Sequence, residues 1–108
     1  MRPLRVLLVE QSAAVREALA ARLRHEEEIA AVEACDSAEC LAGAGPADVV
    51  IVHYRFYEVV VAQRPGVPVV VISGGPPPPD FRGIWVMKPA PMADLLPAVK
   101  AAVAAKEG

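Results

Sequence analysis

The chain has 108 residues, with eleven basic and thirteen acidic side chains and a net charge of −2. This length fits one domain, residues 1–108, and leaves no room for a second folded unit. Hydrophobic residues make up 55% of the chain, which is ample for a buried core and excludes intrinsic disorder. The net charge is too low to give the positive surface potential that binds nucleic acid. No apolar run reaches the length of a membrane span. Residues 1–5 lead into a strand-like segment rather than a signal peptide. We therefore expect a cytoplasmic domain without membrane or nucleic-acid partners.

Five apolar runs have the length of β-strands. They are Leu4–Val9, Ile29–Ala34, Val49–Val52, Val67–Ile72 and Ile84–Met87. The third and fourth runs are almost entirely Val and Ile, without the alternation of apolar and polar residues that a half-exposed sheet shows. This pattern is typical of strands that are buried on both faces of a parallel sheet, so helices must cover both sides.

The segment between the first two runs predicts an amphipathic helix. Ser12 is a natural N-cap, and Val15, Leu19 and Leu23 follow at four-residue spacing before the segment ends at Arg24. These apolar residues share one helix face, which we expect to pack on the sheet.

Two other segments favour helix. Asp36 or Ser37 can cap a short helix that runs through Leu41 and ends in a Gly- and Pro-containing stretch. The final segment, Asp94–Lys106, is rich in alanine, and we expect its first residue to be the N-cap. Pro97 then falls at the third helical position, where its missing N–H costs little.

The two remaining connections are unusual. Residues 54–66 contain the β-branched triplet Val59–Val61, which allows at most a short helix. Residues 76–79 are four consecutive prolines, which favour a polyproline II segment and exclude an α-helix. The order of strands and helices predicts a doubly wound α/β domain with right-handed crossovers, in which a Pro-rich loop replaces the helix between the fourth and fifth strands.

The two cysteines, Cys35 and Cys40, are too few for a disulfide scaffold. They have no His or Cys partners at the spacing of a zinc site, so we expect reduced thiols in the core. His25 lies in a run of charged residues at the end of the first helix, and we expect it on the surface.

Four segments carry sequence landmarks in a fixed order. They are Leu4–Ser12, Ala47–His53, Val67–Ser73 and Trp85–Pro89. Over essentially the whole chain they make the sequence resemble the receiver domain of two-component response regulators. The resemblance implies a CheY-like, flavodoxin-like fold whose five-stranded parallel sheet has the order 2-1-3-4-5. It also implies a cis Lys88–Pro89 peptide bond and an aromatic switch residue at Trp85.

The resemblance assigns a degenerate phosphorylation pocket to this chain. Glu10 holds the first acidic position, but Gln11 replaces the second acid and His53 replaces the phosphoacceptor Asp. Mg²⁺ prefers carboxylate oxygens, so we expect the magnesium site to be lost, with no cofactor and no enzymatic activity. Ser73 and Lys88, which hold the phosphoryl group in the family, remain, and we expect Lys88 to pair with Glu10.

The resulting expectation is an atypical receiver that acts in signal transduction as a phosphorylation-independent protein-interaction module. Two alternatives remain open. An imidazole can accept a phosphoryl group, so the chain could be a phosphotransfer protein that uses His53, although without a metal ion the developing charge is poorly neutralised. It could also bind a small ligand in the crevice at the carboxyl ends of the strands.

The shortened connections predict thin cover over one face of the sheet. The apolar and aromatic residues in or beside them are Phe56, Tyr57, Val59, Val60, Phe81 and Trp85. Open apolar surface is unfavourable, so we expect a homodimer or a protein partner on this face. In the alternative, Phe81 and the prolines fold back and seal the face, and Trp85 is a static plug rather than a switch.

Overall fold

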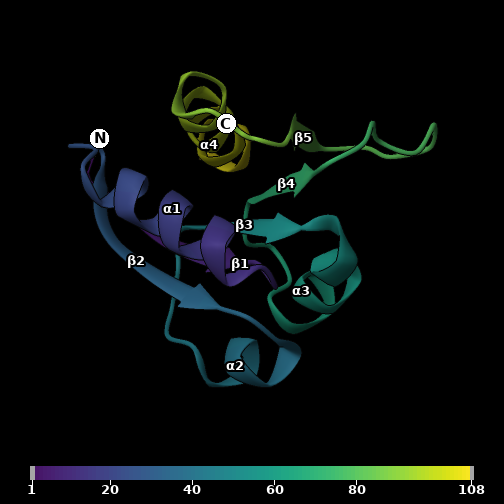
Figure 1. Cartoon of the computed structure of the whole chain (residues 1–108), viewed down its shortest axis with the longest axis horizontal. Helices are drawn as coiled ribbons and strands as arrows, with labels where there is room; N and C mark the ends of the chain where they lie inside the picture. The colour runs from purple at the N-terminus through teal and green to yellow at the C-terminus, as the bar shows by residue number, and fades with distance from the viewer. Residues whose placement is uncertain (1, 108) are drawn as a thin grey trace.

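The computed structural model describes residues 2–107 and contains a five-stranded parallel sheet between two layers of helices (Figure 1). The elements in chain order are β1 (Leu4–Val9), α1 (Ala13–Arg24), β2 (Ile29–Cys35), α2 (Ala38–Gly43), β3 (Val49–His53), the 3-10 helix η1 (Tyr54–Phe56), α3 (Tyr57–Gln63), β4 (Val69–Ser73), β5 (Ile84–Met87) and α4 (Met92–Glu107). The strand order is β2-β1-β3-β4-β5, which confirms the predicted topology. No helix in the described part of the chain has both the length and the apolar composition to cross a membrane.

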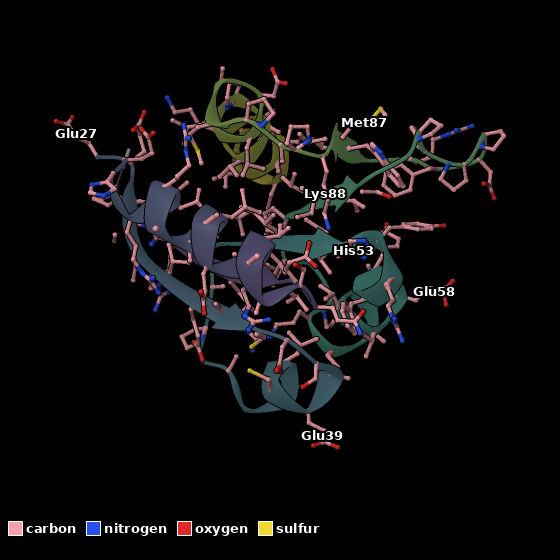
Figure 2. The ribbon with its side chains drawn as sticks, viewed as in Figure 1. Glu27, Glu39, His53, Glu58, Met87 and Lys88 are labelled. Atoms are coloured by element: carbon pink, nitrogen blue, oxygen red, sulfur yellow. The ribbon has the colours of Figure 1, made fainter. Side chains whose placement is uncertain are left out.

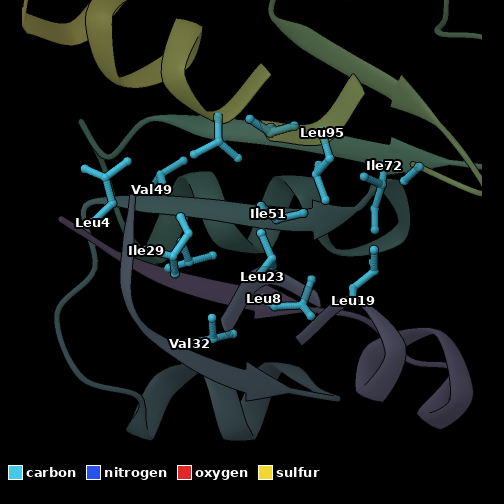
Figure 3. Packing of buried hydrophobic residues seen from close by; sticks show 14 of the residues in the cluster. Leu4, Leu8, Leu19, Leu23, Ile29, Val32, Val49, Ile51, Ile72 and Leu95 are labelled. Atoms are coloured by element: carbon cyan, nitrogen blue, oxygen red, sulfur yellow. The ribbon is translucent and has the colours of Figure 1, made fainter. Parts of the chain in front are cut away.

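The larger core lies between the sheet and the helices α1 and α4. Leu8, Ile51 and Ile72 point to this side from three neighbouring strands, and Leu23 of α1 and Leu95 of α4 pack against this cluster (Figure 3). All five side chains are fully buried. The apolar spacing of α1 predicted from the sequence therefore supplies this layer.

The second core lies on the opposite face, under α2 and α3 (Figure 1). Val50, Val52 and Val71 point to this side, and they contact Leu41 of α2 and Val60 of α3, each fully buried. Because successive residues of a strand alternate between the faces, the Val- and Ile-rich strands fill both cores.

Helix boundaries agree with the sequence in α1 and differ in α4. The side-chain oxygen of Ser12 accepts a hydrogen bond from the Val15 N–H at 3.4 Å, so the predicted N-cap of α1 is confirmed. Helix α4 begins at Met92, and Asp94 lies in its first turn, so the predicted N-cap was wrong. The helix starts earlier because the Pro91 carbonyl already accepts the N–H groups of residues 94 and 95. Pro97 consequently sits at the sixth helical position rather than the third.

Helix α2 and β4 show two further differences. Ser37 is the cap of α2, and its hydroxyl accepts the Cys40 N–H at 3.2 Å. Leu41 points into the core, whereas Cys40, one position earlier, is exposed, so the prediction of a core thiol was right for Cys35 and wrong for Cys40. Strand β4 begins at Val69, two residues later than predicted.

The connection between β4 and β5 contains no helix, as the prolines predicted. It runs outward beyond the end of the sheet, at the right of Figure 1. The only regular feature of this connection is a turn in which the Phe81 N–H donates to the Pro78 carbonyl at 3.0 Å. Gly83 has φ of 147°, and a Cβ there would lie 3.1 Å from the Phe81 ring, so glycine allows the ring to fold inward.

Candidate functional site

The predicted site residues gather at the carboxyl edge of the sheet. Glu10 directly follows β1, His53 ends β3, Ser73 ends β4 and Lys88 directly follows β5. Figure 2 shows Lys88 and His53 at this edge. Parallel strands present all their carboxyl ends on one side, which is why residues far apart in the sequence meet here.

Glu10 is the buried centre of the site, with 1% of its surface exposed. Its Oε1 atom forms an ion pair with the Lys88 ammonium, as the sequence predicted. Oε2 accepts the Ser12 N–H at 3.0 Å, and the Glu10 N–H donates to the Cys35 carbonyl at 3.0 Å. The carboxylate therefore has a partner on each oxygen, although the ammonium meets Oε1 outside ideal hydrogen-bond geometry.

Burial of Glu10 opposes its ionisation and on its own would raise its pKa. The contact with the Lys88 ammonium and its charge, together with the hydrogen bond from the Ser12 N–H, outweigh burial and hold the pKa below its ordinary value. Glu10 is therefore a carboxylate at neutral pH, and Lys88 is the cation that balances it.

His53 is half-buried, and one of its nitrogens is already engaged. Its Nδ1 atom accepts the Arg55 N–H at 3.1 Å, which leaves Nε2 as the protonated nitrogen of a neutral ring. Burial and the Lys88 charge lower the pKa of His53, against the opposing charge of Glu10. The ring is therefore neutral at physiological pH.

Gln11 is exposed at the rim of the site, where its Oε1 atom accepts a hydrogen bond from Arg55 Nη1 at 2.9 Å. Arg16 of α1 donates to the Glu10 carbonyl at 2.9 Å and to the Gln11 carbonyl at 3.3 Å. Sequence reasoning missed both arginines. Arg55 carried a usable signal, because it lies two residues after the strand-ending His53, whereas Arg16 reaches the site only through the packing of α1.

Ser73 lies at the same edge, but its hydroxyl turns toward the loop after β4. Its Oγ atom accepts the Gly75 N–H at 3.4 Å, and its carbonyl accepts the Lys88 N–H at 2.7 Å. The backbone of Ser73 thus helps to place Lys88. The Lys88–Pro89 peptide bond is cis, which confirms the prediction.

An aromatic cluster of four residues, Tyr54, Tyr57, Phe81 and Trp85, lies beside the site. The Phe81 ring lies 5.1 Å from the Trp85 ring and 5.4 Å from the Tyr57 ring, and Tyr54 lies 5.0 Å from Trp85. Trp85 Nε1 donates to the Gly75 carbonyl at 3.0 Å. Phe81 therefore folds back over the second core, which is one part of the sealed alternative, and Phe81, Tyr57 and Trp85 are half-buried. The other part is not met, because Pro76, Pro77 and Pro79 are exposed.

No protein-family model and no curated protein matches the sequence. Solved structures do match. A response regulator receiver protein from Sinorhizobium medicae WSM419 aligns over 96% of this chain and 97% of its own, with a TM-score of 0.72 and 22% identity. A CheY-like receiver domain protein from Methanospirillum hungatei JF-1 aligns over 99% and 98%, with a TM-score of 0.77 and 18% identity. The signal receiver domain of a modulated diguanylate cyclase from Desulfovibrio desulfuricans G20 aligns over 97% of both chains, with a TM-score of 0.77 and 17% identity.

The fold is that of a response regulator receiver domain. Within this receiver fold, Glu10, His53 and Lys88 stand at the carboxyl ends of β1, β3 and β5, the positions that the sequence landmarks assigned to them. Among residues 2–107, no three or more His, Cys, Asp or Glu side chains are placed to share a metal ion. Lys88, Arg55 and Arg16 bring three cationic side chains to this edge of the sheet.

Proposed function

We propose that this chain is an atypical receiver domain that acts in cytoplasmic signal transduction as a protein-interaction module and is not phosphorylated. The ion pair between Lys88 and Glu10 carries the proposal. In this pair the lysine that would hold a phosphoryl group is already neutralised by the single acidic residue of the pocket, and His53 stands at the acceptor position. The Lys88 charge is therefore balanced without phosphate.

The residues present do not fit a magnesium ion. Glu10 supplies the pocket's one carboxylate, and Lys88 and the Ser12 N–H occupy its two oxygens. The Gln11 amide oxygen accepts a hydrogen bond from Arg55, and His53 offers nitrogen rather than oxygen. To bind here, Mg²⁺ would have to displace Lys88 from the Glu10 carboxylate and Arg55 from the Gln11 amide oxygen, and the imidazole of His53 is a poor ligand for this hard ion. We therefore propose that the domain needs no metal cofactor.

His53 is a poor phosphoacceptor in this geometry. Attack on a phosphoryl donor needs an unshared electron pair, but Nδ1 shares its pair with the Arg55 N–H and Nε2 carries the proton. The groups around His53, a lysine-paired carboxylate and an amide, do not fit a metal ion that could neutralise the transferred group. This arrangement favours an interaction module over the alternative of phosphotransfer.

Binding of a small ligand in the carboxyl-end crevice receives less support. One cavity of about 520 Å³ lies at the opposite, amino-terminal edge of the sheet, near Asp48 and Val67. Another of about 490 Å³ lies beside the crevice, between α1 and residues 88–91, and has mostly apolar walls. Neither cavity includes Glu10 or His53.

We propose the aromatic cluster as the surface for a protein partner or a second copy of the chain. Tyr54 keeps 40% of its surface exposed. Aromatic side chains of this kind are frequent anchors of interfaces. Because Phe81 already covers part of the face, the surface available for a homodimer is smaller than the sequence predicted.

The test combines magnesium titration with exposure to a small phosphoryl donor. We expect no magnesium binding in the sub-millimolar range by calorimetry and no mass gain after incubation with acetyl phosphate. A gain of one phosphoryl group that His53→Asn abolishes would overturn the proposal and support phosphotransfer. A phosphoryl group on any other residue would also overturn it.

A further inference from the structure

The two cysteines meet at the junction of β2 and α2. Cys35 ends β2 with 1% of its surface exposed, and the Cys40 side chain lies near enough to its thiol to raise its pKa. Cys40 lies on α2 and is exposed to solvent. The pair thus combines one thiol that an oxidant can reach with one that it cannot.

Local structure holds Cys40 over the end of β2. The Ser37 hydroxyl caps α2 by accepting the Cys40 N–H at 3.2 Å. The Cys40 Sγ atom reaches back to the carbonyl of Ala34, the residue before Cys35, at 3.9 Å. The second contact places the Cys40 sulfur beside the backbone of the residue that precedes Cys35.

We propose that Cys35 and Cys40 form a reversible disulfide when the chain meets a peroxide. This site lies outside the receiver pocket and does not depend on the proposed function. The exposed Cys40 is the thiol that is oxidised first, and the buried Cys35 is the resolving thiol.

The chemistry proceeds in two steps. The Cys40 thiolate attacks one oxygen of the peroxide, the O–O bond breaks, and the second oxygen leaves as water after taking up a proton, so that Cys40 becomes a sulfenic acid. The sulfur of Cys35 then attacks the sulfur of Cys40, the S–O bond breaks, and a second water leaves with the proton of the Cys35 thiol. Overall, two thiols lose two electrons and two hydrogens, and the peroxide is reduced to water. A dithiol reductant reverses the disulfide by exchange.

The surroundings separate the roles of the two thiols. Burial, the contact with Cys40 and the nearby carboxylates of Glu33 and Asp36 raise the pKa of Cys35 to about 12. Cys35 is therefore a protonated thiol at neutral pH and does not react with the oxidant itself. Its proximity to Cys40 compensates for its low thiolate fraction.

The thiol pair is connected to the receiver site through the backbone. The Cys35 carbonyl accepts the Glu10 N–H at 3.0 Å. A disulfide at Cys35 would therefore alter the backbone at the end of β2, which accepts the N–H of the buried Glu10. We expect the amide signals of Glu10 and its neighbours to shift in NMR spectra when the disulfide forms.

The experiment treats the reduced chain with hydrogen peroxide at low protein concentration, then alkylates it under denaturing conditions and measures its intact mass. We expect the wild type to lose two hydrogens and to take up no alkylating agent, and a dithiol reductant to restore both alkylation sites. In Cys40→Ser the remaining buried thiol should stay reduced. In Cys35→Ala the sulfenic acid on Cys40 has no resolving thiol and should be trapped by a sulfenic-acid reagent.

The competing outcomes are distinguishable. Two alkylatable thiols after peroxide treatment, overoxidised Cys40 without a disulfide, or only disulfides between chains would each overturn the proposal. If Cys35→Ala does not fold, peptide mapping of the oxidised wild type decides the question, because it shows directly whether the peptides containing residues 35 and 40 are joined.

Discussion

The Lys88 ammonium, in the loop after β5, forms an ion pair with the buried carboxylate of Glu10 at the end of β1. This contact connects the interior strand β1 to the edge strand β5 across the pocket. Its removal leaves a buried charge unpaired, so the pair connects the electrostatics of the site to the stability of the fold.

Lys88→Met should lower the free energy of unfolding by about 2–3 kcal/mol, less than the loss for a fully buried pair because the Lys88 side chain is 21% exposed. Urea unfolding of this variant, of Glu10→Gln and of the double variant measures the coupling between the residues. We expect the double variant to be more stable than the sum of the single losses predicts. Additive losses would show that the ion pair contributes little.

Acid should destabilise the fold partly through Glu10. The pKa of Glu10 in the folded chain lies below its ordinary value of 4.5, so the unfolded chain binds more protons as the pH falls. The stabilisation is therefore fully present above about pH 4.5 and is lost as the pH falls through the folded-state pKa. Urea unfolding at a series of pH values should show that acid lowers the free energy of unfolding less in Glu10→Gln than in the wild type. Parallel curves would contradict this.

Lys88→Met should also raise the pKa of His53. Burial lowers this pKa first and the Lys88 charge lowers it further, so removal of the cation leaves a smaller depression from the ordinary value of 6.5. NMR titration of the imidazole signals measures the shift. Arg82→Met is the matched control, because this exposed cation does not contribute to the His53 pKa, and the titration of His53 should not change.

Restoration of the acidic residues should restore metal binding. Gln11→Asp with His53→Asp introduces two carboxylates near Glu10 and replaces the amide that accepts the Arg55 side-chain hydrogen bond. We expect the double variant to bind Mg²⁺ measurably by calorimetry, because hard carboxylate ligands replace an amide and an imidazole. Gln11→Asn with His53→Asn preserves polarity without charge and should not bind. Equal binding by both variants would argue against a carboxylate site.

Phe81→Ala should open the aromatic cluster. Loss of the ring removes its contacts with Trp85 and Tyr57 and should lower the free energy of unfolding by about 1–3 kcal/mol, since Phe81 is only half-buried. We expect the Trp85 fluorescence to shift to longer wavelength and sedimentation to show more self-association than in the wild type. Unchanged fluorescence would mean that Phe81 does not cover Trp85 in solution.

Most of the fold could be predicted from the sequence because strand burial and helix spacing leave local signals. The Val- and Ile-rich runs marked β3 and β4, and the spacing of Val15, Leu19 and Leu23 marked α1. The prolines excluded a helix between β4 and β5. Boundaries were less accurate where backbone hydrogen bonds in a loop set them, as at Pro91, whose carbonyl accepts two N–H groups so that α4 begins three residues earlier than predicted.

The pocket could be predicted only in part. The positions of Glu10, His53 and Lys88 follow from their places at the ends of parallel strands. The resemblance to a receiver pocket, together with their opposite charges, indicated that Lys88 pairs with Glu10. The hydrogen bond from Arg55 to Gln11 and the folding of Phe81 onto Trp85 depend on how long side chains from separate loops come to rest against one another. No local pattern records such distances, because each depends on the packing of the whole sheet and its two helical layers.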